Sequence, residues 1–363
     1  MNKHDEEKNF TVFGLPWLGL LVFISFVEKQ LSSHTMRLPG ASRRALLSHS
    51  LSHSLSLVAL FGSARVQRDG IAFAAEPSSE AVARAKGAFA AFDQRDLPLA
   101  DRLFTQTIEE WRRLDRGVEE ITSLLVARAG VRTDNREFSA AKADLDEAIA
   151  LMRPTGEKSN GLGAYREYPD AFVQRGLANE GLRDWRGALS DYDKAVSLWG
   201  GAGDGVNPYT LTYRARARAE VGDYEGALSD YRGASSIFSR VDKNVEQSSF
   251  ARAGEAVTLY ALDRRDEAVR VARQVVTRFP GLTDLHVLLA ADAWDRGDRE
   301  KAIKEWSFAC DAISTGCAKY RDVKEGGWLV EVRRWPAPLV QRQRTFLEES
   351  QGGVMMGARA AGS

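Results

Sequence analysis

The chain has 363 residues, of which 44% are hydrophobic and 28% are charged, so it is long enough to bury a sizeable core. Its 50 basic side chains balance 50 acidic ones, which argues against the broad positive surface of a nucleic-acid-binding protein. Two cysteines, Cys310 and Cys317, are too few for a disulfide scaffold or a cysteine-rich metal site.

The N-terminal part of the chain contains an apolar run. Residues 10–27 are 18 uncharged and mostly apolar residues, which is the length of a candidate membrane helix. Pro16 and two glycines interrupt the run, and three acidic residues at 5–7 precede it where a signal peptide would be basic. Three interpretations stay open: a signal or anchor, a spurious upstream extension over residues 1–35, and a membrane helix that remains in the mature protein.

A second leader-like segment covers residues 36–74. It is rich in Ser, Leu and Arg and nearly free of acidic residues, as organelle transit peptides are. Within it, Arg43-Arg44 precede an apolar run at 46–61, and the Ala-Phe-Ala sequence at 72–74 has the form of a cleavage box. The order of these features resembles the bipartite leader of thylakoid-lumen proteins. A disordered N-terminal tail is the alternative.

One helical-hairpin pattern occurs twice between residues 169 and 241. Both copies contain Gly-Ala-Leu-Ser-Asp-Tyr, at 187–192 and 226–231. In each copy a small residue (Gly176 or Ala215) precedes an alanine by twelve positions, an aromatic residue follows four positions later, and a second alanine follows after three more. Small residues allow two helix backbones to approach closely while the aromatic ring fills the space beside them. The pattern therefore predicts an antiparallel helix pair.

This pattern resembles the tetratricopeptide repeat (TPR), in which about 34 residues form one helix pair. The alanine that opens the second helix can be aligned at Ala100, Ala141, Ala188, Ala227, Ala268 and Ala302. The resemblance implies an all-α superhelix, a TPR solenoid of five to six helical hairpins over residues 78–309. We expect the repeats at about 81–114, 122–155, 169–202, 208–241, 249–282 and 283–316, with turn-rich inserts at 154–163 and 200–208.

Three middle repeats share a pair of charged residues that the minimal motif does not require. An arginine directly precedes the small residue of the first helix, and an aspartate lies sixteen positions after that arginine. The pairs are Arg128 with Asp144, Arg175 with Asp191, and Arg214 with Asp230. We expect partly buried, bidentate ion pairs between the two helices of each hairpin, with contact to a ligand as the alternative.

The sequence predicts no catalytic, cofactor or metal site. His286 is the one histidine of the body, and such a residue is most often a packed or surface side chain. In solenoids of this kind the first helices line a concave groove that binds a partner. Counting from the aligned alanines, and weighing aromatic and arginine side chains as interface anchors, gives these candidates for the groove: Gln174, Tyr209, Thr212, Arg216, Val257, Tyr260, Val287 and Trp294.

The periodicity stops after Ala309. Residues 310–348 contain the two cysteines, a Tyr-Arg-Asp sequence at 320–322, and an Arg-Arg-Trp-Pro sequence at 333–336 that precedes a short amphipathic stretch. This combination resembles the C-terminal signature of a family of chloroplast thylakoid-lumen TPR proteins of plants and green algae. We expect a cap in which two tryptophans cover the apolar end of the solenoid, or alternatively a docking site, followed by a disordered tail at 349–363.

The two cysteines of the cap lie seven positions apart, which is too far for a disulfide along one continuous helix. Gly316 and the residues before it indicate that the helix ends between them, so the chain could fold back and bring the sulfur atoms together. In the oxidising lumen that the resemblance implies, a disulfide between Cys310 and Cys317 is favoured. A redox switch and two free thiols are the alternatives.

The leader and the tail together imply a protein of the chloroplast thylakoid lumen, with peripheral association with the thylakoid. We expect a non-enzymatic scaffold that binds a protein partner in the groove, without nucleic acid, small-molecule substrate or cofactor. The family resemblance implies a role in assembly or maintenance of photosynthetic complexes. Two alternatives stay open: a membrane-anchored TPR adaptor outside the lumen, and an enzyme or enzyme regulator whose catalytic unit lies in the tail.

Overall fold

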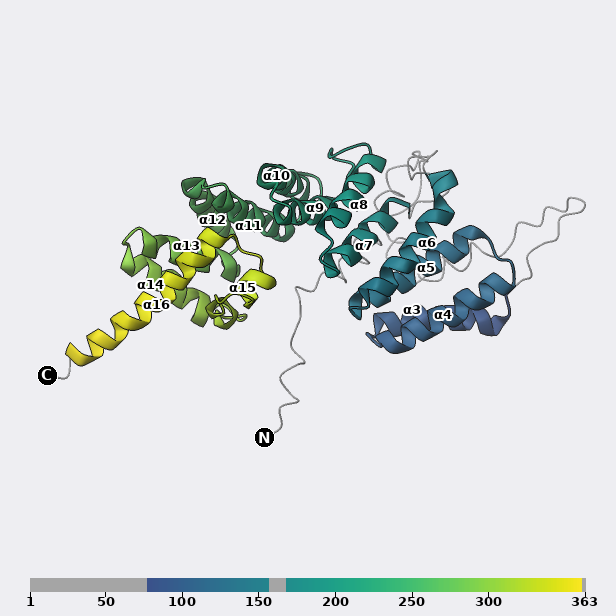
Figure 1. Ribbon diagram of the computed structural model, residues 1–363, viewed down its shortest axis with the longest axis horizontal. Coiled ribbons are helices and arrows are strands. Elements are labelled where there is room, and N and C mark those ends of the chain that lie inside the picture. Colours follow the sequence, from purple (N-terminus) through teal and green to yellow (C-terminus); the bar gives the residue numbers. More distant parts are fainter. Residues whose placement is uncertain (1–76, 157–167, 361–363) are drawn as a thin grey trace, which may run out of the picture. The chain divides into compact units, whose positions relative to one another are not determined.

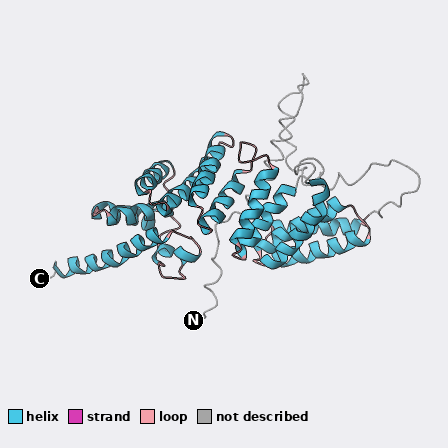
Figure 2. Cartoon of the chain, turned by 45° about the horizontal axis from the view of Figure 1, so that its top comes forward, coloured by secondary structure: helices cyan, strands magenta, loops and turns pink. Residues whose placement is uncertain are grey.

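The structure is a computed structural model that describes residues 77–156 and 168–360; side chains are described through Ser350, except at 155–156. Every regular element in these ranges is a helix, as Figure 2 shows. None of these helices is both long enough and apolar enough to span a membrane. The expectations for the leader, residues 1–74, and for most of the insert at 154–163 concern residues outside the described ranges.

Six helix pairs form the body of the described chain, and consecutive helices pack against each other (Figure 1). The predicted all-α TPR solenoid is confirmed, and each expected repeat overlaps one pair. The pairs are α3 (Ser79–Asp93) with α4 (Leu97–Arg113), α5 (Val118–Asp134) with α6 (Phe138–Gly156), α7 (Tyr168–Gly181) with α8 (Trp185–Leu198), α9 (Pro208–Glu220) with α10 (Tyr224–Arg240), α11 (Val245–Ala261) with α12 (Arg265–Arg278), and α13 (Thr283–Asp295) with α14 (Arg299–Ser307).

The first helices of neighbouring pairs also lie beside one another, because α5 contacts α7 and α7 contacts α9. We call the surface of α3, α5, α7, α9, α11 and α13 that faces away from their second helices the first-helix face. In a TPR solenoid this is the concave side, which is where the sequence predicts a partner.

Short turns join the two helices of each pair, and most of the second helices begin with an aspartate cap. The carboxylates of Asp184 and Asp223 accept hydrogen bonds from the backbone N–H groups three residues later, each over 2.9 Å. Asp96 and Asp298 make the equivalent bonds. Each cap satisfies a backbone donor that the first helical turn leaves unpaired. Because an aspartate cap acts only on the adjacent helical turn, it fixes the residue at which the second helix starts.

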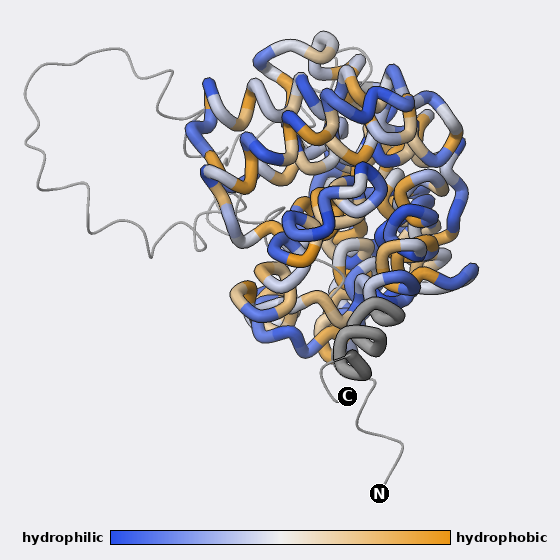
Figure 3. The backbone as a smooth tube through the Cα atoms, turned by 90° about the vertical axis from the view of Figure 1, so that its left-hand side faces the viewer, coloured by the Kyte–Doolittle hydropathy of each residue, from blue (hydrophilic) through white to orange (hydrophobic). Residues whose placement is uncertain are grey.

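Alanines form the contact between the helices of each pair. All six aligned alanines are fully buried. In the third pair, a Cβ atom added to Gly176 would lie only 2.5 Å from the Tyr192 ring, so a larger residue would displace the ring. Hydrophobic and hydrophilic residues alternate within the helices, as Figure 3 shows. This alternation lets each helix bury one side against its neighbours.

A C-terminal segment follows the last pair. It consists of a π-helical turn (Phe308–Ala312), a 3₁₀ turn (Ala318–Arg321), the short helix α15 (Trp328–Glu331) and the long helix α16 (Ala337–Ala360). We call residues 310–350 the cap. Helix α16 packs on α13 and α11, which are both first helices, so the cap lies on the first-helix face (Figure 1).

The position of the cap changes two expectations from the sequence. Phe346 and Leu347 pack with Ala302 of the last pair, as an end cap would, but Trp335 and Leu339 are buried in one cluster with Leu285 and Val287 of α13. The cap therefore covers the first-helix face of the last pairs in addition to their end. Disorder was expected from residue 349, whereas α16 continues to Ala360. The part of α16 before residue 349 has already formed the costly first turn, so adding further turns requires little more free energy.

Candidate functional site

The arginine–aspartate pairs connect the two helices of the middle hairpins. In the second pair, Arg128 Nε and Nη2 donate to the two carboxylate oxygens of Asp144 over 2.9 and 2.7 Å. Arg214 Nε and Nη2 donate to the two carboxylate oxygens of Asp230 over 2.8 and 2.7 Å. Arg175 Nη2 donates to Asp191 over 2.6 Å. The aspartates of all three pairs are buried, so these contacts belong to the interior of the solenoid.

Each of these arginines also reaches back to the preceding hairpin, which the sequence analysis missed. The bond is made by the remaining guanidinium nitrogen, Nη1. Arg128 donates to Thr105 over 2.9 Å, Arg175 to Asp146 over 2.7 Å, and Arg214 to Asp193 over 3.0 Å. The three acceptors lie five positions after the aligned alanines of their own hairpins. This regular spacing was a signal available in the sequence. Each arginine therefore joins two helices of one hairpin and also two hairpins.

A second donor completes the coordination of each buried aspartate. Arg132 donates to Asp144, Asn179 to Asp191 and Arg218 to Asp230, over 2.8, 2.9 and 2.9 Å. These donors lie one helical turn after the paired arginines. Burial disfavours the charge of Arg214, yet its hydrogen bonds to Asp230 and Asp193 raise its pKa above the ordinary value. The pairs are thus satisfied structural contacts.

Three of the eight groove candidates are buried and are not available to a partner. Tyr209 packs its ring 4.8 Å from that of Phe238 on the second helix of its own pair. Val287 of α13 is completely buried, in the cluster that also contains the cap residues Trp335 and Leu339. Tyr260 is 3% exposed, and its hydroxyl donates to Asp292 over 2.6 Å. Counting from the repeat motif placed these residues on the correct helices, but it could not show what covers them.

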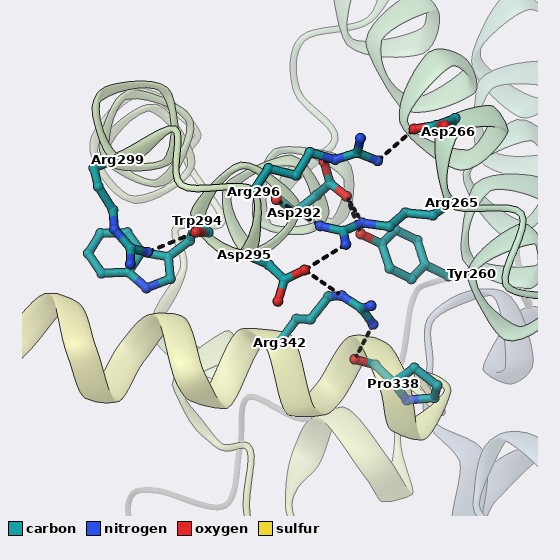
Figure 4. Close-up of polar contacts among 10 residues, drawn as sticks. All are labelled: Tyr260, Arg265, Asp266, Asp292, Trp294, Asp295, Arg296, Arg299, Pro338 and Arg342. Carbon is teal, nitrogen blue, oxygen red and sulfur yellow. Dashed lines mark hydrogen bonds and ion pairs between the residues drawn. The ribbon is translucent and has the colours of Figure 1, made fainter.

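The cap also covers Trp294. Its indole Nε1 donates to Glu349 over 2.7 Å, and its ring lies 5.3 Å from the ring of Phe346. The guanidinium carbon of Arg299 lies over the Trp294 ring, 3.8 Å from its centre. Figure 4 shows Trp294 beneath Arg299 and close to α16. Trp294 therefore contacts the protein's own C-terminal helix instead of an open groove.

The other four candidates, Gln174, Thr212, Arg216 and Val257, are partly exposed. The Thr212 hydroxyl donates to the backbone carbonyl of Tyr209 in its own helix over 2.7 Å. Arg216 Nη2 donates to both oxygens of Glu180 on α7, over 3.0 and 3.1 Å. Of these candidates, Arg216 is the one that joins neighbouring first helices.

Arg216 belongs to a polar cluster on the third and fourth pairs. Glu180 accepts a hydrogen bond from the Tyr192 hydroxyl over 2.7 Å in addition to the bonds from Arg216. The Arg216 guanidinium lies 5.0 Å from the centre of the Tyr213 ring, within the range of a cation–π contact. Burial, together with the nearby Glu180 charge, raises the pKa of Tyr192 well above its ordinary value. Tyr192 therefore stays neutral, and its hydroxyl donates a hydrogen bond to Glu180.

A second polar cluster holds the cap to the last two pairs (Figure 4). The buried carboxylate of Asp292 accepts hydrogen bonds from Tyr260, from Arg265 Nε over 2.5 Å and from Arg296 Nε over 2.9 Å. Arg265 Nη1 also pairs with Asp295 over 2.6 Å, and Arg342 of α16 approaches the same carboxylate at 3.3 Å. The cluster was not predicted, because none of its contacts follows the repeat spacing.

Cys310 and Cys317 form a disulfide, with their Cα atoms 4.5 Å apart. Helix α14 ends at Ser307, the backbone is extended at Ile313, and Gly316 has a positive φ of 60°. The chain therefore turns back between the two cysteines. The disulfide joins the π-helical turn that follows α14 to the start of the 3₁₀ turn.

The other notable features lie away from the first-helix face. His286 is buried and its ring nitrogens bond to Glu305 and to the Pro280 carbonyl, over 2.7 and 3.0 Å. A cavity of about 350 Å³ is lined mainly by the second helix α12, with Arg270, Arg273 and the ion pair of Arg296 with Asp266 among its residues. Within the described ranges, no cluster of His, Cys, Asp or Glu side chains could hold a metal ion.

The chain matches no protein-family model and no curated protein. Solved structures that it resembles include the TPR-like repeats of a protein of the kinesin light chain type from Podosopora anserina, with 14% identity over 56% of this chain and 96% of that chain, and a TM-score of 0.48. A tetratricopeptide repeat protein from Parabacteroides merdae has 13% identity over 63% and 78%, with a TM-score of 0.48. BtubC from P. vanneervenii has 17% identity over 58% and 87%, with a TM-score of 0.47.

Proposed function

We propose that this protein is a non-enzymatic scaffold that binds a segment of a protein partner on the first-helix face of its first four helix pairs. The observation that carries the proposal is the division of this face. Helix α16 of the cap packs on α11 and α13, whereas the first helices of the earlier pairs keep partly exposed apolar and polar side chains. A solenoid presents such a face as a continuous binding surface.

The open part of the face has the composition of an interface. Phe89 of α3 is 45% exposed, and its ring also packs 4.9 Å from that of Phe104 on α4. It lies eleven positions before the aligned alanine of its pair, as Arg216 does in the fourth pair. Leu177 holds the same position in the third pair and is partly exposed. Aromatic, aliphatic and arginine side chains on one surface are the types that anchor a partner protein. Phe89 and Leu177 were not among the sequence candidates.

Site-specific photo-cross-linking tests the proposal. A photoreactive phenylalanine analogue at Phe89 or Leu177 should form a covalent product with a partner in extracts of the source cells. The same analogue at Ile303, a 42% exposed residue of the second helix α14, provides the control. Products that form equally well from Ile303, or that form from neither first-helix position, would contradict the proposed binding face.

The cellular setting is proposed on separate grounds. The leader pattern at 36–74 and the tail signature support a role in the thylakoid lumen, in assembly or maintenance of photosynthetic complexes, with peripheral association with the thylakoid. A membrane-anchored adaptor that keeps residues 10–27 is the alternative. Sequencing the N-terminus of the protein isolated from its source cells distinguishes the two. A start near Ala75 supports the lumenal role, whereas a start at Met1 rejects it.

A further inference from the structure

The cap extends beyond the last two helix pairs and places one arginine side chain on the third and fourth pairs. Arg334 lies between α15 and α16, and its guanidinium carbon is 4.2 Å from the centre of the Trp185 ring. Its nitrogens lie 3.8 Å from Glu180 and 3.6 Å from Glu220. Glu331 of the cap also pairs with Arg183, over 2.6 Å. The face of the Trp185 ring and the carboxylates of Glu180 and Glu220 therefore surround the Arg334 guanidinium.

The two neighbouring arginines of the cap are held very differently. Arg333 donates through Nε to Asp284 over 2.6 Å and makes a second, parallel bond to the same buried carboxylate. Arg334 faces its carboxylates at distances beyond a direct hydrogen bond. Its backbone has a positive φ of 55°, which is unfavourable for a residue with a side chain. Arg333 thus anchors the cap. Arg334 lies between Glu180 and Glu220 without a direct hydrogen bond to either carboxylate.

The surroundings of Arg334 are suited to a cation that is bound more closely. Burial raises the pKa of Glu220, and Arg334 opposes this effect only in part. Burial also lowers the pKa of Arg334 itself. An arginine that approached from a separate chain could stack on Trp185 and still form direct bonds to a carboxylate, because the backbone of the cap would not restrict it.

We propose that Trp185, Glu180 and Glu220 form a binding site for an arginine side chain of the partner, and that Arg334 is an intramolecular occupant which the partner displaces. The inference rests on the proposed function, since it assigns the chemistry of the partner where α7 and α9 end, next to the start of α8. The partner is then a peptide segment with an exposed arginine. Its binding competes with the contact of Arg334 and leaves the Arg333 anchor in place.

The Arg334→Gly substitution gives a direct test, because glycine adopts a positive φ readily and the cap should stay folded. The probe is a fluorescein-labelled peptide, Val-Gln-Arg-Trp-Pro-Ala-Pro, which copies residues 332–338 with glutamine in place of the anchoring arginine. Fluorescence anisotropy with the purified full-length chain should show at least about tenfold tighter binding by the Arg334→Gly variant than by the unmodified protein. A second peptide with glutamine in place of its arginine should not bind.

Two further variants locate the binding. Adding Glu220→Gln or Trp185→Leu to Arg334→Gly should each weaken the peptide affinity by about tenfold, since each removes one contact to the guanidinium. Arg321→Ala provides the matched control, because Arg321 is a cap arginine that lies 5.1 Å from the ring of Trp306, away from the site. It should bind the peptide as the unmodified protein does.

Equal affinity of the Arg334→Gly and unmodified proteins, no binding to either, or binding that survives both second substitutions would overturn the inference. Circular dichroism of each variant confirms that the helices are retained. These outcomes are separate from the cross-linking test. A partner that cross-links to Phe89 or Leu177 without competing with the peptide would preserve the proposed function and reject the arginine site.

Discussion

The middle and the C-terminal helix pairs are joined to their neighbours in two different ways. In the second to fourth pairs, an arginine of the first helix binds the aspartate of the second helix and also reaches the preceding pair. In the fifth and sixth pairs, Glu255 and Leu289 take the place of that arginine. There Asp292 collects three donors, and the cap lies across the first helices.

The difference shows that helix pairs of one architecture can be joined in two ways. The contacts of the middle pairs repeat with the sequence, so each pair can follow the previous one without any distant segment. The last pairs depend on residues far away in the chain, such as Arg333, which binds Asp284 over a separation of 49 residues. The cap covers the first-helix face of these pairs, and the corresponding face of the earlier pairs is the one that we propose for a partner.

Of the substitutions that distinguish the two regions, Asp292→Ala should have the largest effect on the free energy of unfolding. It leaves Arg265, Arg296 and the Tyr260 hydroxyl without their shared buried acceptor. We expect the free energy of unfolding to fall by about 3–5 kcal/mol, the range for breaking a buried charge network. Urea denaturation measures the loss. A loss below about 1 kcal/mol would show that the cluster does not hold the last pairs together.

The Arg214→Ala substitution should have a somewhat smaller effect in the middle of the solenoid. Asp230 loses its bidentate partner but keeps the hydrogen bond from Arg218. We expect a loss of about 2–4 kcal/mol, because a buried carboxylate is then only partly compensated. Urea denaturation of Arg214→Ala, Asp230→Ala and the double variant gives the coupling energy. Additive losses would mean that the pair contributes no interaction of its own.

The Gly176→Ala substitution tests the close approach of two helices in the third pair. The added Cβ would lie 2.5 Å from the Tyr192 ring. We expect a loss of about 1–3 kcal/mol from overpacking. Gly87→Ala is the matched control, because its Cβ would lie 3.6 Å from Leu103 and alanine favours a helix by up to about 1 kcal/mol. Thermal unfolding should shift in opposite directions for the two variants, and equal shifts would contradict the packing.

The smallest expected effect is the pH dependence of Asp295. Burial alone would raise the pKa of Asp295, but Arg265 and Arg342 lower it below its ordinary value of 3.8. The contribution to stability is therefore present above pH 4, approximately, and is lost as the pH falls through the lowered pKa. Because Asp295 is partly exposed, solvent screening limits the contribution to under about 1 kcal/mol.

The difference in stability between the unmodified protein and Asp295→Asn measures this contribution. The difference should be positive at about pH 5 and shrink as the pH falls through the lowered pKa of Asp295. A difference that stays constant over this range would show that the charge of Asp295 does not help to hold the cap.

The sequence predicts those parts of the structure that repeat. The aligned alanines are all buried, and the spacing of sixteen residues places Arg128 near Asp144 because it is fixed by two helices and one short turn. The additional bonds to the preceding hairpin follow the same period but need the packing of two hairpins. The position of the cap could not be predicted, because its contacts, such as Arg342 with Asp295, obey no period. The cap accounts for the burial of the groove candidates Val287 and Tyr260, whereas Tyr209 is buried against the second helix of its own pair.

Hydrogen exchange of the backbone amides at 339–347 tests whether α16 occupies the first-helix face of the last pairs. We expect slow exchange, within about tenfold of the amides of α13, because residues of both helices are buried together in two clusters. Exchange at the rate of an unstructured peptide would show that α16 leaves this face, and the division of the solenoid into an open part and a covered part would be contradicted.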